Sequence, residues 1–186
     1  MTTGETGMHN LLRMFLNAAA LLLEATDKQL DQRGAQKAIA SIWSQMPMMS
    51  NEVLRSAEEL MDEPSRSIHT PHENERKWLK ALIDELGTPT DRPQLTADDS
   101  WKSLTHGVAW FAFCLREASN YAEDEEYGAA GFRQICEMLQ GMDSEEQAVV
   151  VAGVTEASVQ FDRSEVRQPR ITEAYDELLS YATNQD

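Results

Sequence analysis

The sequence predicts an all-α protein, folded as a single-domain compact helical bundle of about seven to eight helices. Apolar residues recur three and four positions apart in nearly every segment, which is the spacing of one helix face. Several segments begin with Thr or Asp followed three residues later by an acidic residue, the pattern of a helix cap. Strand-like alternation is lacking. We expect residues 1–7 to form a flexible lead-in and residues 8–183 to form the domain.

The first predicted helix contains an apolar run, Leu11 to Leu23, with eleven apolar residues among thirteen. The run is shorter than the roughly 20 residues that span a membrane, and no positive charge precedes it as in a signal peptide. Its polar residues form one narrow stripe, so the helix should lie at the centre of the bundle and end near Arg33, with Gly34 after it. The stripe consists of Arg13, Asn17, Glu24 and Lys28.

Three further helices follow in the first half of the chain. Pro47 should end the second helix, and Ser50 or Asn51 should cap the third, which closes at Pro64. "TPHE" reads as the capping box of a fourth helix that ends at Gly87. The predicted apolar faces are Ala38, Ile39, Ile42, Trp43 and Met46, then Val53, Leu54, Ala57, Leu60 and Met61, then Trp78, Leu79, Leu82, Ile83 and Leu86.

The second half predicts four more helices. Thr96 begins one whose apolar run "VAWFAFCL" indicates a second central helix, and the next ends at Gly141. Asp143 opens a helix that includes Ala148–Val154, where a buried strand is the competing interpretation because Val is β-branched. The last helix begins near Pro169. The expected faces are Trp101, Leu104, Val108, Phe111 and Leu115, then Phe132, Ile135, Cys136 and Leu139, then Val150, Val154, Ala157 and Phe161, then Ile171, Ala174, Tyr175, Leu178 and Ala182.

The formal net charge is −16 at pH 7, from 32 acidic and 16 basic residues. A field of this sign repels phosphate backbones and anionic membranes, so we expect no direct binding to nucleic acid or to membranes. The same field would attract a basic protein partner. A solvated surface would account for the acidity equally well, as would a proteome-wide bias that also produces eleven Arg against five Lys.

Cys114 and Cys136 both fall within apolar helical patterns, where a free thiol behaves as a small hydrophobe. We expect both to be reduced and buried. With no export signal, this predicts a cytoplasmic protein. The oligomeric state is not indicated by the sequence.

The short motifs of common enzymes are absent: GxxxxGK[ST], GxGxxG, GxSxG, HExxH, CxxC and Glu-x-x-His do not occur. No cofactor is therefore predicted. The trio His69, His72 and Glu75 has residue types that bind zinc or iron. However, His69 precedes the predicted helix cap, and His72 lies where the helix dipole disfavours a cation, so we predict no metal site.

Carboxylates three residues apart on helices offer a second route to catalysis. Glu59 and Asp62 have this spacing, as do Glu123 and Glu126, and facing pairs of this kind hold Mg²⁺ in helical phosphohydrolases. The alternative function is therefore a metal-dependent hydrolase of a phosphorylated small molecule. A solvated acidic helix face accounts for the same residues, because 32 acidic residues produce such pairs by chance.

The leading hypothesis is a non-enzymatic protein that acts through protein–protein interaction, as an inhibitor or adaptor that covers a basic surface of its partner. Flexible Met side chains adapt to partner surfaces, and "MPMM" lies next to an acidic helix. The alternative is that Met46 and one neighbour belong to the core. The predicted partner-binding residues are Met46, Met48, Met49, Glu58, Glu59, Asp62 and Glu63.

Overall fold

The computed structural model describes residues 3–25, 32–62, 72–118, 125–163 and 169–183. These residues form eight α-helices and one short 3₁₀ helix, and they contain no strand. The all-α prediction is confirmed, and Ala148–Val154 is helical. The elements are α1 Thr3–Glu24, α2 Gln32–Trp43, η1 Met46–Met48, α3 Asn51–Asp62, α4 His72–Leu86, α5 Ala97–Ala118, α6 Glu125–Gln140, α7 Ser144–Arg163 and α8 Pro169–Thr183.

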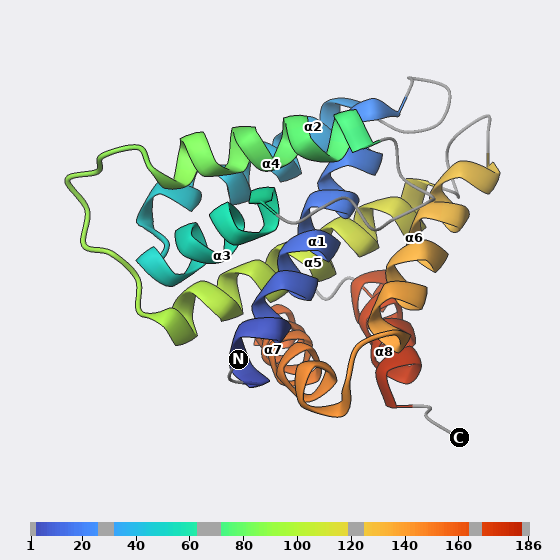
Figure 1. Cartoon of the computed structure of the whole chain (residues 1–186). Coiled ribbons are helices and arrows are strands. Elements are labelled where there is room, and N and C mark those ends of the chain that lie inside the picture. Colours follow the sequence, from blue (N-terminus) through green and yellow to red (C-terminus); the bar gives the residue numbers. More distant parts are fainter. Residues whose placement is uncertain (1–2, 26–31, 63–71, 119–124, 164–168, 184–186) are drawn as a thin grey trace.

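Helices α1 and α5 cross the middle of the molecule (Figure 1). One group of helices, α2, α3 and α4, packs on one side of this pair, and a second group, α6, α7 and α8, packs on the other. Both α1 and α5 contact members of each group. The two helices with the longest apolar runs are therefore central, as predicted, because a helix that is apolar on most sides needs neighbours on most sides.

The α1–α5 crossing is close because Gly107 lies within it. A Cβ atom on Gly107 would lie 2.8 Å from Cε2 of Phe15 and 3.1 Å from Cγ2 of Ile42. The absence of a side chain lets the Phe15 ring pack directly against α5, where it also meets Phe111 at a centroid distance of 5.3 Å. This contact fixes the central pair on which the other helices pack.

Of the predicted capping boxes, the one at Asp143 is formed in full and the one at Thr96 is formed in part. The Thr96 hydroxyl accepts a hydrogen bond from the backbone N–H of Asp99 at 3.1 Å and donates one to its carboxylate at 2.7 Å. Asp143 Oδ1 accepts from the N–H groups of Glu145 and Glu146 at 3.0 and 2.9 Å, and Glu146 Oε2 accepts from the N–H of Asp143 at 3.1 Å. These bonds satisfy N–H groups that have no partner within the helix, so they fix where α5 and α7 begin.

The ends of the first helix differ from the prediction. Helix α1 ends at Glu24 instead of continuing to Arg33, and Gly34 lies inside α2 instead of after α1. The sequence from Ala25 to Arg33 offers a single large apolar residue, Leu30, so a longer helix would gain little from packing. At the other end α1 already begins at Thr3, while the flexibility of residues 1–7 stays a prediction.

No helix in the described ranges combines the length and the apolar content needed to cross a lipid bilayer.

Candidate functional site

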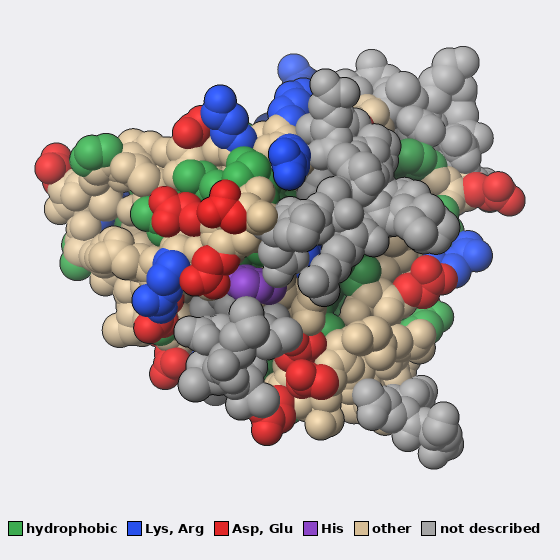
Figure 2. All heavy atoms as spheres, in the orientation of Figure 1, with side chains coloured by type: hydrophobic (Ala, Val, Ile, Leu, Met, Phe, Trp, Pro, Cys, Tyr) green, Lys and Arg blue, Asp and Glu red, His purple; other side chains and the backbone are tan. Residues whose placement is uncertain are grey.

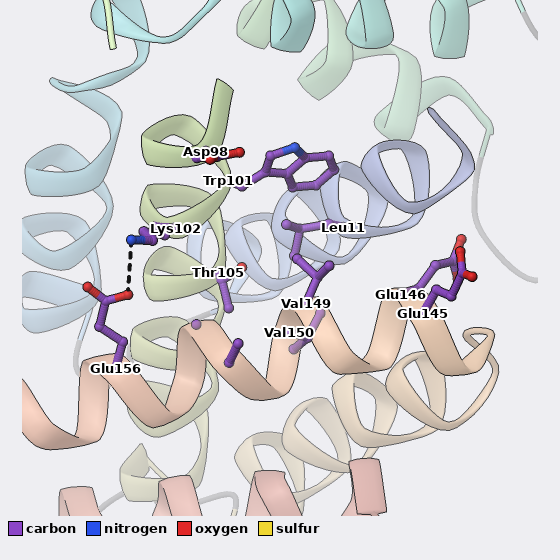
Figure 3. Close-up of a pocket in the computed structure, with 12 residues that line it drawn as sticks. Leu11, Asp98, Trp101, Lys102, Thr105, Glu145, Glu146, Val149, Val150 and Glu156 are labelled. Atoms are coloured by element: carbon purple, nitrogen blue, oxygen red, sulfur yellow. Dashed lines mark ion pairs between the residues drawn. The ribbon is translucent and has the colours of Figure 1, made fainter. Parts of the chain in front are cut away.

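A groove of about 410 Å³ lies between α1, α5 and α7 (Figure 3). None of the residues that line it was predicted as a site from the sequence. One residue comes from α1, four come from the first nine residues of α5, and seven come from the first thirteen residues of α7. They are Leu11, Asp98, Trp101, Lys102, Thr105, Glu145, Glu146, Val149, Val150, Ala152, Gly153 and Glu156.

Helix α7 presents a stripe of four exposed residues to this groove, at spacings of four, three and four. The stripe is Glu145, Val149, Ala152 and Glu156, so its two ends are acidic and its middle is apolar. On its other side α7 buries Val150, Val154 and Ala157 in the core. The Val149 side chain is 48% exposed. Two large hydrophobic side chains are exposed among the described residues, and these are Val149 and Val159. Helix α7 therefore has apolar residues on two sides. The side with Val150, Val154 and Ala157 is buried in the core, and the side with Val149 and Ala152 is exposed in the groove.

The middle of the groove is apolar on all three helices. Figure 3 shows the Trp101 indole of α5, the Leu11 side chain of α1 and the Val149 side chain of α7 next to one another. Leu11 is 1% exposed and belongs to the core cluster, and Trp101 is half-buried against that cluster. Leu11 is thus the buried floor of the groove, and Trp101 and Val149 supply its exposed apolar surface.

Gly153 sets the depth of the groove by allowing α7 to lie close to α5. A Cβ atom on Gly153 would lie 2.5 Å from Cγ2 of Thr105, a distance that real side chains do not adopt. The Thr105 hydroxyl beneath this contact is buried and has no hydrogen-bond partner among the described residues. Any larger residue at position 153 would push α5 and α7 apart and so widen the bottom of the groove.

Acidic side chains lie at both ends of the apolar middle. Glu145 lies at one end and Glu156 at the other, and Asp98 lies on the α5 side (Figure 3). Lys102 is the basic residue of the groove lining, and its Nζ lies 3.5 Å from Oε2 of Glu156. Both side chains of this pair are about half exposed, at 56% and 48%, so the ion pair contributes little and can exchange partners.

Glu146 lines the groove but has a structural role. Its carboxylate accepts the Asp143 N–H in the capping box and a second hydrogen bond, at 2.8 Å, from Nδ2 of Asn10 on α1. The residue is 5% exposed. These bonds hold the start of α7 against α1, so Glu146 positions the groove wall and is not free to receive a ligand.

His106 lies one turn after Lys102 on α5 and is not among the residues that line the groove. Burial lowers the pKa of this imidazole, and the negative charge of Glu156 opposes that shift only in part. The groove lining itself holds four acidic residues and one basic residue, Lys102.

The predicted methionine surface requires a correction. Met46 and Met49 are 0% and 2% exposed, so both belong to the core, and only Met48 is partly exposed. The α4–α5 loop covers this segment: the N–H of Leu95 donates to the Met48 carbonyl at 2.6 Å, and Nη1 of Arg92 lies 3.8 Å from its sulfur. Of the two interpretations left open by the sequence, the core alternative is the correct one.

The acidic part of that predicted face is exposed. Glu58, Glu59 and Asp62 are exposed on α3, and Glu63 lies outside the described residues. Figure 2 shows acidic side chains gathered over the α3 region. Glu59 is bonded to the His9 ring at 3.2 Å, which links α3 to α1. With Met46 and Met49 buried, this face has charge but lacks the apolar anchors that a partner-binding surface needs.

The candidate metal ligands that the structure describes do not form a cluster. His69 lies outside them, as does Glu123, and the side chains of His72 and Glu75 on the first turn of α4 are not described. Glu59, Asp62 and Glu126 are exposed. Within the described ranges no group of three or more His, Cys, Asp or Glu side chains lies close enough to hold a metal ion.

Both cysteines are free. Cys136 is buried and Cys114 is partly exposed, and burial raises the pKa of each thiol from 9.0 to about 12. Both are protonated at neutral pH, so neither has the thiolate that a cysteine nucleophile requires.

Comparison with protein-family models, with curated proteins and with solved structures finds no match to this chain. The groove itself is therefore the basis for a functional proposal. Sequence reasoning missed it because its lining comes from three helices far apart in the chain. The one signal that could have indicated it was the stripe at 145, 149, 152 and 156, which lies beside the core-facing stripe at 150, 154 and 157.

Proposed function

We propose that this protein acts by binding a basic segment of another protein in the groove between α1, α5 and α7. One observation carries the proposal: the groove has an apolar middle, around Trp101, Leu11 and Val149, with carboxylates at both ends. Partly exposed apolar side chains in a concave site anchor a partner, and flanking charges steer its approach and select its sign. An overall charge of −16 favours the same class of partner.

The proposal keeps the sequence-based hypothesis of an acidic interaction protein and moves the binding face from α3 to α7. Covering a cationic segment would block that segment from anionic ligands, which is how an inhibitor or adaptor of a basic protein would act. A cytoplasmic location is part of this proposal and is supported by two free thiols.

The test is affinity capture from native cell lysate with three immobilised proteins: wild type, Val149→Glu and Val159→Glu. Both variants add one negative charge at an exposed valine on α7, but only Val149 lines the groove. We expect a basic protein that wild type and Val159→Glu capture and that Val149→Glu loses, with weaker capture at high salt because ionic strength screens exposed charges.

Circular dichroism of all three proteins confirms that each retains its helices. If every captured protein is retained equally by Val149→Glu, the groove is not the binding site and the proposal is wrong.

A further inference from the structure

We infer that the bound segment is an α-helix that lies along α7 and carries basic, apolar, apolar and basic residues at positions i, i+4, i+7 and i+11. This inference rests on the proposed function and specifies its partner. The pattern mirrors the exposed stripe of Glu145, Val149, Ala152 and Glu156 on α7. Partner cations would meet the two glutamates, and the apolar pair would cover Val149 and Trp101 above the buried Leu11.

The spacing of the stripe is that of a helix–helix seam. Residues alternating four and three apart stay on one side of a helix, so two such stripes can face each other along their length. From Glu145 to Glu156 the stripe extends about 16 Å, at 1.5 Å per residue. Ala152 in its middle is small, which lets a partner backbone approach closely, and Trp101 on α5 forms the opposite wall.

A helical partner fits this floor better than an extended one. An extended segment gains affinity by adding backbone hydrogen bonds to the edge of a sheet, and the described residues contain no strand. Over an apolar floor its N–H and C=O groups would lose water without gaining partners. A helix satisfies these groups internally and presents only side chains to the groove.

Lys102 competes with the partner for one end of the site. Its Nζ forms an ion pair with Glu156 at 3.5 Å, and both side chains are about half exposed. A cation of the partner can therefore replace Lys102 in this weak ion pair. Removing the Lys102 charge while keeping an apolar stem should therefore strengthen binding. Removing a basic residue elsewhere would change the net charge by the same amount, but Glu156 would stay paired with Lys102. Stronger binding is therefore expected only when Lys102 itself is replaced.

The test uses two synthetic peptides of about 18 residues, long enough for partial helicity in an alanine-rich background. The first has Lys, Leu, Leu and Lys at i, i+4, i+7 and i+11. The second has the same composition with Leu, Lys, Lys and Leu at those positions. Dissociation constants are measured by fluorescence anisotropy against the full chain, and peptide helicity is measured by circular dichroism of the complex.

We expect the first peptide to bind at least about tenfold more tightly than the second and to gain helicity on binding. Val149→Glu should abolish this preference, and Val159→Glu should keep it. Lys102→Met should tighten binding several-fold, whereas Lys80→Met, with the same charge change at an exposed site on α4, should have a much smaller effect.

Equal affinity for the two peptides, no binding of either, or binding without added helicity would each overturn the inference. Weaker binding by Lys102→Met would do the same. The two proposals fail separately: capture from lysate that depends on Val149 while neither peptide binds would retain the proposed function, and peptide binding without any such captured protein would refute that function alone.

Discussion

Methionine has a flexible side chain that suits a partner surface and a core equally well. Whether the Met46 side chain is buried or exposed therefore depends on the residues that surround it. Met46 and Met49 lie in the core cluster, while Met48, next to both in the chain, is partly exposed. Three neighbouring methionines thus have two different environments.

We predict that Met46→Ala lowers the free energy of unfolding by about 2–5 kcal/mol, because it leaves a cavity at a fully buried site. Met48→Ala is the matched control and should cost about 1 kcal/mol or less, since its side chain is only partly covered. Urea denaturation of both variants measures the difference. Equal losses would contradict the buried position of Met46.

The buried thiols give the stability a pH dependence. The thiol pKa of Cys136 and of Cys114 is about 12 in the folded chain and 9.0 as the unperturbed value. Below pH 9 both states hold the proton, so stability is unaffected. Between pH 9 and about 12 the unfolded thiols ionise first, so stability falls as the pH rises.

Urea midpoints at pH 8, 9 and 10 test this prediction, with Cys136→Ala as the control because it removes one titrating group. The wild-type midpoint should fall above pH 9, and the fall should be smaller in the variant. Identical pH profiles for the two proteins would show that Cys136 does not contribute.

At the scale of helices, the α1–α5 contact depends on one missing side chain. We predict that Gly107→Ala destabilises the fold by about 1–3 kcal/mol, because the added methyl would lie 2.8 Å from the buried Phe15 ring. Gly141→Ala, whose new atom would meet only ordinary contacts at 3.5 Å or more, is the matched control and should be close to neutral.

Thermal unfolding of the two glycine variants provides the measurement. If Gly107→Ala melts at the temperature of Gly141→Ala, the close approach of α1 and α5 is not a constraint on the fold.

For the whole molecule, the net charge of −16 sets the response to salt. We predict that the melting temperature at pH 7 rises when NaCl increases from about 0.01 M to about 0.15 M, because screening weakens repulsion among the carboxylates. The same titration at pH 5, nearer to the sequence pI of about 4.6, should give a smaller rise. A melting temperature that falls with salt at pH 7 would mean that attractive ion pairs outweigh the repulsion.

Local sequence patterns account for most of the fold. Thr96 and Asp143 mark the starts of α5 and α7 through hydrogen bonds that span only three residues. The apolar stripe of Ile171, Ala174, Tyr175, Leu178 and Ala182 is fully buried on α8, as its spacing predicts. Where the local signal was absent, in the stretch after Glu24, the predicted boundary was wrong.

The sequence by itself determined the helices, their order along the chain and the central positions of α1 and α5, because caps and 3.6-residue periodicity act between near neighbours. Only the tertiary structure decided which apolar residues stay exposed. Met46 is buried in the core, while Val149 stays half exposed beside Leu11 and Trp101. The groove exists because Leu11, Trp101 and Val149 meet there, and contacts between residues so far apart in the chain follow from helix packing, which no local pattern specifies.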